Sequence, residues 1–509
     1  MNTMANALWQ TKSASALTLL GLLHHLTIHK RTFTNLLSAY ILLYIFKHRR
    51  TAIFVKPRKD LKTPGGSLPL VGDIIKMTFQ PRTQVSQLNE QLHREMGKVF
   101  TITLPFVGRV VDFTDPAVLE HVLKTNFWAY EKGEFTHRTM YDLLGRGIFG
   151  ADGHYTSEVF VKESHIVADY LGMIAEEERT VDIHKLFYLY TLDSFGEISF
   201  GQSFGCLDNP EVGQVEFATA FDRLSTVVFN RFFTPGWQIT ERLTSRGRQI
   251  REDKKTITNF ALKIIRDRRI HGFDKPQKDL LQLCMDMQDA EDGRPLSDEM
   301  LKDLVLNFII AGRDTTAQAL AWMFYLLFRS QTDPRIVQRL VQEVDDVLQG
   351  QAPTYDSCKK MKFAEACFYE SLRLYPSVPW NMKVAVQDDV WPDGTKIYKG
   401  EFVSWNVWTM GRDTTIWGHD ARDYNPDRWT CGEKFPAHKF AAFHAGPRTC
   451  LGQQFATAEA ITILAILLQR FTFELVNPDT EPGYLPGLTL RMAEGLPLRV
   501  HHRPGFPFS

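Results

Sequence analysis

The 509-residue chain is poor in the features that mark several common protein classes. Its six cysteines, at positions 206, 284, 358, 367, 431 and 450, include no Cys-x-x-Cys pair. This spacing excludes a disulfide framework and a zinc ribbon, and it favours reduced thiols in a cytosolic setting. Lysine and arginine together number 59, against 59 acidic residues. Because a phosphate backbone selects clustered positive charge, this balance argues against nucleic acid as a partner.

No uninterrupted apolar run reaches the about 20 residues that span a bilayer. Two shorter runs, at 16–28 and 32–46, are separated by a short basic segment, and they predict either one interrupted span or a membrane hairpin. Several basic residues follow within 47–59, whereas only Lys12 precedes the first run. By the positive-inside rule, the rest of the chain lies on the cytosolic side. A cleaved signal peptide would carry its basic residues in front, so a membrane anchor is favoured.

The anchor is assigned to residues 1–50, and a basic hinge rich in Pro and Gly to residues 51–75. Beyond the hinge there is no low-complexity linker, charged tail or internal repeat. Helical patterns dominate residues 115–375, whereas alternating runs at 99–104 and 396–403 predict a minor sheet. Residues 76–509 are therefore expected to form one large domain that is mainly α with a small β region.

Cys450 stands apart from the other cysteines. It lies in FHAGPRTCLG, residues 443–452, directly before a helical pattern too hydrophobic around its circumference for a surface helix. Backbone N–H groups and the helix dipole at such an N-terminus favour thiolate over thiol. A lone thiolate cannot complete a zinc site, but it can be the single protein ligand of a haem iron. The alternative is a buried structural cysteine, which the ten-residue context disfavours.

The neighbours of Cys450 suit a haem ligand. Gly446 permits a tight turn, Phe443 can pack on a porphyrin, and Arg448 can pair with a haem propionate. These residues resemble the haem loop of the cytochrome P450 family, F-x-x-G-x-R-x-C-x-G, and with Gly452 they match every fixed position. The resemblance implies the cytochrome P450 fold and haem b with Cys450 as axial iron ligand.

A second apolar helix is predicted over 297–328, with a serine as its N-cap. It contains Ala-Gly-Arg-Asp-Thr-Thr at 311–316, where Gly312 is expected to leave room against a flat ligand. Asp314 and Thr315 are expected to relay protons during oxygen activation. Polar residues that merely face solvent are the alternative, which the crowded apolar neighbours disfavour. In the resembled family this is the oxygen-activation helix, and Thr315 matches its catalytic alcohol.

Glu370 and Arg373 are three residues apart, so they adjoin on one helix face that the apolar pattern turns inward. A buried ion pair must be fully satisfied, and Arg428 is the expected third member. The resembled family has such a network in a fold-supporting role. Residues 379–385 resemble the family segment that lines the haem. Lys383 stands where many relatives have arginine, and it keeps the charge but loses the bidentate fork.

The resemblance implies monooxygenation of an apolar small molecule: one oxygen atom enters a C–H bond and the other leaves as water. No flavin or nicotinamide domain is evident, so a separate NADPH-dependent diflavin reductase must supply two electrons. With the anchor, this implies contact with membrane lipid at the endoplasmic reticulum, the catalytic domain facing the cytosol. Segments 217–223, 230–237 and 392–418 resemble the microsomal fatty-acid and alkane ω-hydroxylase branch. Terminal or near-terminal hydroxylation of a long-chain fatty acid is expected; a xenobiotic or secondary-metabolite hydroxylase is the alternative.

Residues 145–150 spell G-x-G-x-x-G, but they follow a helical pattern rather than a strand, which argues against a dinucleotide site. They resemble instead the loop before a family helix whose W-x-x-x-R binds a haem propionate. Here Gly153 is followed directly by His154, and neither residue is present. We infer an apparent deletion of a haem-clamping helix near 153–154, either natural or from a mistaken splice prediction. Poor haem binding follows, and a haem-poor, catalytically impaired membrane protein is the alternative function.

Overall fold

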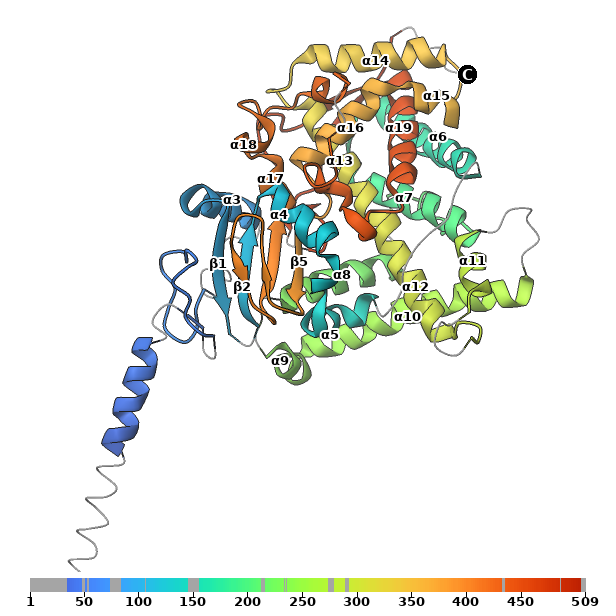
Figure 1. The fold of residues 1–509 in the computed structure, drawn as a ribbon. Helices are drawn as coiled ribbons and strands as arrows, with labels where there is room; N and C mark the ends of the chain where they lie inside the picture. Colours follow the sequence, from blue (N-terminus) through green and yellow to red (C-terminus); the bar gives the residue numbers. More distant parts are fainter. Residues whose placement is uncertain are drawn as a thin grey trace, which may run out of the picture.

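The computed structural model describes residues 34–504 apart from segments at 48–50, 53–54, 74–83, 106, 145–154, 212–215, 233, 235, 273–278, 289–292, 433–434 and 486. Helices make up most of the body, and a small sheet lies to one side of them (Figure 1). The mainly helical class with a small β region is therefore confirmed.

The helical body is built from long helices that pack around one large apolar core. The long helices are α6 (Tyr155–Glu176), α7 (Ile183–Phe200), α8 (Glu216–Arg231), α10 (Ser245–His271), α14 (Pro334–Leu348), α16 (Lys362–Leu374) and α19 (Gln453–Arg470). The shorter helices are α3 (Val85–Met96), α4 (Pro116–Glu120), α5 (Gly133–Leu144), α9 (Trp237–Leu243), α11 (Leu280–Asp286), α15 (Tyr355–Lys360), α17 (Val407–Gly411) and α18 (Thr414–Trp417).

One helix axis runs through the middle of the body. It comprises α12 (Asp298–Ile309), a π-helical turn (Ile310–Asp314) and α13 (Thr315–Phe328), which confirms the helix predicted over 297–328. The Ser297 side chain caps α12 by accepting a hydrogen bond from the Met300 N–H at 3.3 Å. Nearly all of α13 is buried because α7, α16 and α19 pack against it.

The main sheet has five strands in the order β1-β2-β8-β5-β3. Only the β2–β8 pair is parallel. The run predicted at 99–104 is a single strand, whereas the run at 396–403 divides between β7 (Lys396–Ile397) and β8. Gly400 causes this division, since its φ of 87° turns the chain. The strands are β1 (Val99–Leu104), β2 (Gly108–Phe113), β3 (Tyr130–Glu131), β5 (Trp380–Ala385) and β8 (Phe402–Asn406).

A three-stranded sheet joins the ends of two core helices. β12 (Pro497–His502) lies between β4 (Thr180–Asp182) and β9 (Phe471–Leu475). Since β4 leads directly into α7 and β9 follows α19, this sheet holds those helix ends together. Two short ribbons complete the β structure: β6 (Asp389–Val390) with β7, and β10 (Tyr484–Leu485) with β11 (Arg491–Met492).

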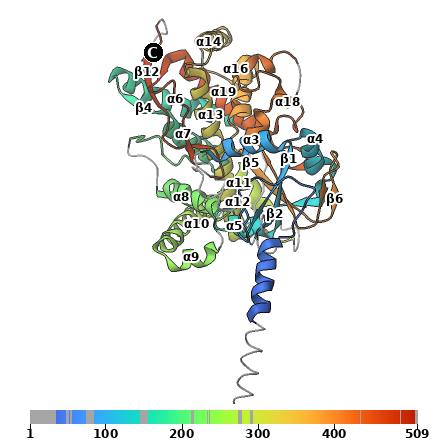
Figure 2. The same cartoon turned by 90° about the vertical axis from the view of Figure 1, so that its left-hand side faces the viewer.

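Residues 34–47 form a helix that projects away from the body in both views (Figures 1 and 2). Its large apolar side chains are exposed, including Leu36, Tyr40, Leu43 and Phe46. Among the described residues, no helix is both long enough and apolar enough to cross a membrane.

Glu459 is a carboxyl group in the fully buried part of α19. It has no exposed surface, and one of its oxygens accepts a hydrogen bond from the Ser194 hydroxyl of α7 at 2.5 Å. Burial raises the pKa of Glu459 to about 8, although the Ser194 hydrogen bond opposes the shift. The folded chain therefore holds this carboxyl group protonated at neutral pH.

We expect Glu459→Gln to change how stability depends on pH. The folded state binds a proton between the ordinary pKa of 4.5 and about 8, whereas the unfolded state releases it. Raising the pH across this window therefore favours unfolding of the wild type, by up to about 1.4 kcal/mol per pH unit. The glutamine variant lacks this contribution and gains stability relative to wild type as pH rises. Urea unfolding at several pH values measures the difference; an unchanged slope contradicts the assignment. Glu176→Gln, at an exposed position on α6, is the control.

Candidate active site

A tight loop presents Cys450 in front of α19. Gly446 has a φ of 65°, and a Cβ atom there would lie 2.0 Å from the Leu123 backbone oxygen, so only glycine fits. The Cys450 N–H donates to the Phe443 carbonyl at 2.8 Å, and the Thr449 N–H donates to the Gly446 carbonyl at 3.0 Å. The glycine and these hydrogen bonds together set the path of the loop.

The Cys450 side chain remains accessible to solvent at the front of this loop. Partial desolvation by the surrounding protein raises the pKa of the thiol, and a hydrogen bond from the Gly452 backbone opposes the shift. The expectation that the helix N-terminus favours thiolate is therefore wrong for the chain alone, because desolvation outweighs the backbone N–H. A metal ion deprotonates a thiol that coordinates it, so the thiolate depends on the ligand.

Cys450 offers a metal only one protein donor. Among the described residues, no group of three or more His, Cys, Asp and Glu side chains is placed to hold a metal ion. A tetrahedral zinc site requires such a group. A metal that already has its other ligands, as haem iron does, requires only the single thiolate.

Three cations gather near this loop: Lys132, Lys383 and Arg448. Burial, together with repulsion from Arg448 and Lys132, lowers the pKa of Lys383 to about 8. Desolvation by the surrounding protein and repulsion from Arg448 likewise lower the pKa of Lys132, although part of its surface is exposed. Within the described part of the chain, none of the three forms an ion pair; the Lys383 ammonium donates to the Tyr130 carbonyl at 3.3 Å. Positive charge held together at such a cost fits an anionic group such as the propionates of haem.

Lys132 is the member of this cluster that sequence reasoning missed. It follows β3 directly, and β3 pairs with β5, the strand that carries Lys383. This pairing joins residues about 250 positions apart, which no local pattern reveals. A lysine beside a strand as short as β3 has no local sequence signal that would have identified it.

The oxygen-activation motif lies at the π-helical turn of the central helix. The Thr315 hydroxyl donates to the Ala311 carbonyl one turn back at 2.5 Å. The Ser377 hydroxyl donates to the Thr315 carbonyl at 2.7 Å. Thr315 is thus held through both its side chain and its backbone. Its hydroxyl bonds to a backbone carbonyl within the π-helical turn, where the regular α-helical hydrogen-bond pattern is interrupted.

Asp314 is buried and ion-paired. Its carboxylate accepts from the Arg313 guanidinium at 3.0 Å, and the same guanidinium donates to Asp222 of α8 at 2.7 Å. Burial raises the pKa of Asp314 to about 6, although Arg313 opposes the shift. A carboxyl group that titrates near neutral pH can both take up and release a proton.

The sequence led us to expect that Gly312 leaves room for a flat ligand, but the structure shows no such room. A Cβ atom at Gly312 would lie 2.0 Å from the ring of Phe195 on α7. The glycine instead allows α7 to cross close to the central helix, and the Phe195 ring fills the space where a larger side chain would lie. The next ring is Phe455 of α19, whose centroid is 5.8 Å from that of Phe195.

Glu370 and Arg373 form a fully buried bidentate ion pair with N···O distances of 2.7 and 2.8 Å. The Trp429 indole N–H and the Asn425 backbone N–H also donate to Glu370, each at 2.9 Å. Arg428 lies 3.5 Å from the same carboxylate, so all three predicted members of the network meet. The network joins α16 to the segment that leads into the Cys450 loop.

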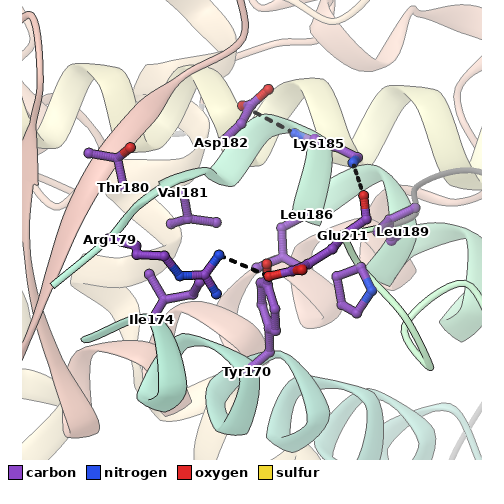
Figure 3. Close-up of a pocket in the computed structure, with 11 residues that line it drawn as sticks. Tyr170, Ile174, Arg179, Thr180, Val181, Asp182, Lys185, Leu186, Leu189 and Glu211 are labelled. Atoms are coloured by element: carbon purple, nitrogen blue, oxygen red, sulfur yellow. Dashed lines mark hydrogen bonds and ion pairs between the residues drawn. The ribbon is translucent and has the colours of Figure 1, made fainter. Parts of the chain in front are cut away.

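A separate cavity of 310 Å³ lies where α6, β4 and α7 meet (Figure 3). Arg179 at its edge is paired with Glu211 at 2.9 Å, and the Lys185 ammonium donates to the Glu211 carbonyl at 3.4 Å. Because its cations already have partners and none of the site residues lines it, we assign this cavity no role in the site.

Known proteins resemble this chain over most of its length. The family model described as Cytochrome P450 matches residues 147–494. The chain is 34% identical to cytochrome P450 monooxygenase cyp1 of Mycosarcoma maydis, over 87% of this chain and 74% of that protein. It is 33% identical to cytochrome P450 704C1 of Pinus taeda, over 86% and 92%. It is 32% identical to cytochrome P450 86B1 of Arabidopsis thaliana, over 76% of each.

Glu370→Gln is expected to destabilise the fold by about 3–5 kcal/mol, because it leaves the buried Arg373 guanidinium without a counter-ion. Glu365→Gln on the same helix is the matched control. Its half-buried carboxylate pairs with the exposed Lys362 at 2.9 Å, and its loss is expected to cost less than about 1 kcal/mol. Urea unfolding followed by circular dichroism measures both variants; equal losses would show that the Glu370 network does not support the fold.

Proposed function

The chain belongs to the cytochrome P450 family, and on that premise we propose that it hydroxylates a long-chain fatty acid or alkane at or near the terminal carbon. The family assignment makes the chain a monooxygenase with thiolate-ligated haem as its cofactor and a redox partner as its electron source. The proposed site is supported by one accessible thiol near three cations that form no ion pair with the described residues. The substrate class is supported by segments 217–223, 230–237 and 392–418, which resemble the ω-hydroxylase branch.

Four residues are proposed to hold the haem. Cys450 supplies the axial thiolate, and Arg448, Lys383 and Lys132 supply positive charge for the propionates. Phe443, which is half-buried and lies 6.1 Å from the Tyr369 ring, is proposed to pack on the porphyrin. When bound, the haem supplies the activation of dioxygen that allows one oxygen atom to enter a C–H bond.

Asp314 and Thr315 are proposed to deliver the protons that this chemistry consumes. Thr315 holds a hydroxyl in the wide turn of the central helix, and Asp314 holds a carboxyl group that titrates near neutral pH. Arg313 keeps the charged form of Asp314 accessible in a buried setting. Glu370, Arg373 and Arg428 are proposed to support the fold without taking part in catalysis.

The source of the electrons and the location of the protein in the cell are also proposals. We assign the electrons to an NADPH-dependent diflavin reductase and the protein to the endoplasmic reticulum membrane, with the catalytic domain facing the cytosol. The exposed apolar side chains of the helix at 34–47 support lipid contact by residues 1–50. Residues 51–75 then serve as the hinge and residues 76–509 as the catalytic domain.

The deletion inferred near 153–154 lies outside the described residues. We propose it on the sequence alone, because Gly153 is followed directly by His154 and the W-x-x-x-R of the resembled family is not present at this point. The same feature favours a second candidate function, a haem-poor and catalytically impaired membrane protein.

Restoring a helix with W-x-x-x-R between 153 and 154 is expected to raise haem content severalfold. The restored helix would add an indole N–H and a guanidinium to the propionate site. Haem-to-protein ratio and the reduced CO difference spectrum of the two expressed chains measure this effect. Full haem loading of the chain without that helix contradicts the proposed deletion.

Spectral titration of the haem-loaded protein tests the substrate class. Lauric acid is expected to displace water from the haem and give a type I shift, because an apolar chain in the site excludes water. Bulky aromatic compounds of matched solubility are the comparison and are expected to give weaker shifts. A response to the aromatics but to no fatty acid of any length would favour the xenobiotic or secondary-metabolite alternative.

A further inference from the structure

Arg231, the last residue of α8, is buried with 3% of its surface exposed. Its guanidinium holds the Glu241 carboxylate of α9 in a bidentate pair at 3.0 and 2.8 Å. The guanidinium also lies 4.0 Å from the centre of the Trp237 ring. Planar bidentate pairing and stacking on an aromatic ring are the geometry with which arginine recognises a carboxylate.

This carboxylate-binding geometry lies where three helices meet. Arg231 also donates to the Thr139 carbonyl of α5 at 3.4 Å. The adjacent surroundings are apolar, because the rings of Phe135 and Phe232 pack with centroids 5.7 Å apart. Helices α5, α8 and α9 gather at the same end of the body in both views (Figures 1 and 2).

Helix α5 connects this position to the candidate active site. It begins one residue after Lys132 of the cationic cluster, and Gly133 packs against Val384 beside Lys383. Thr139 therefore lies about 10 Å along the helix from that cluster, at 1.5 Å per residue. Under the proposal below, an acyl chain held by its carboxylate at Arg231 runs along α5 toward this cluster.

Glu241, the partner that now occupies Arg231, lies on an exposed helix. None of the seven residues of α9 is buried, so little apolar packing opposes its displacement. Exchanging Glu241 for another carboxylate keeps the guanidinium paired, and it adds no uncompensated charge to the buried position. An external carboxylate can therefore take the place of Glu241 without leaving Arg231 unpaired.

We propose that Arg231 binds the carboxylate of a long-chain acid substrate and that Glu241 occupies this position in the free protein. The inference rests on the proposed function, and it adds the group that sets the orientation of the substrate. An acid anchored at Arg231 presents its opposite end to the haem site, which accounts for terminal regiochemistry. Alkanes and alcohols of the same length lack this anchor.

Two substitutions have effects of opposite sign under this proposal. Arg231→Gln removes the anchor and is expected to weaken lauric acid binding about tenfold or more, with 1-dodecanol binding unchanged. Glu241→Gln removes the internal competitor and is expected to strengthen lauric acid binding. A salt bridge that only supports the fold predicts weaker binding from both substitutions, because each one loosens α9.

Equilibrium dialysis of the full-length protein with lauric acid and 1-dodecanol tests the proposal. Asp253→Asn is the matched control, because it removes a carboxylate from another arginine of α8, Arg223, at 2.5 Å. The control is expected to leave both affinities unchanged. Arg231→Lys keeps the charge but loses the bidentate fork, and it is expected to lie between wild type and Arg231→Gln. Thermal unfolding of each variant confirms that it is folded.

The possible outcomes distinguish a failure of the role proposed for Arg231 from a failure of the proposed substrate class. Opposite shifts for Arg231→Gln and Glu241→Gln, confined to lauric acid, support the assignment of Arg231. Equal losses for both ligands in Arg231→Gln, or weaker lauric acid binding in Glu241→Gln, overturn that assignment and leave the apolar substrate class standing. Failure of wild type to bind either ligand overturns the proposed substrate class, and the role of Arg231 falls with it.

Discussion

The position of the site depends on the hydrogen bonds and the ion pair that satisfy the buried charge of Arg373. A guanidinium has five N–H donors, and here every one has an acceptor: two reach the Glu370 carboxylate, and three reach the carbonyls of Gly411, Ala421 and Asp423. A charge without exposed surface is tolerated only when it is satisfied in this way. The requirement fixes α16 against the segment that leads from α17 into the Cys450 loop, whose described part contains only short helices and turns.

The cations beside Cys450 present the opposite situation. Lys132, Lys383 and Arg448 repel one another, and none has an ion-pair partner in the described part of the chain. The thiol is likewise shifted away from its charged form. We propose that this cluster, which forms no ion pair with the described residues, binds an anionic ligand. Haem would meet both needs, since its propionates would offset the positive charge and its iron would favour the thiolate.

Much of this could be predicted from local sequence, because the deciding features are local. The apolar pattern before and after 311–316 sets the central helix, and the spacing of Glu370 and Arg373 places both on one inward face. Three features required tertiary packing. Lys132 reaches the cluster through strand pairing, the Phe195 ring fills the space at Gly312, and desolvation outweighs the helix N-terminus at Cys450. Long-range partners and the balance between burial and dipole are not encoded in any short window.

The central claim is that this chain holds haem through the single thiolate of Cys450. Electron paramagnetic resonance of the protein supplied with excess ferric haem, beside Cys450→Ser, tests it most directly. Our account predicts a low-spin thiolate spectrum from the wild-type chain, even where occupancy is low, and the loss of that spectrum in the serine variant. Identical spectra from the two proteins would contradict it, because the iron would then have a ligand other than Cys450.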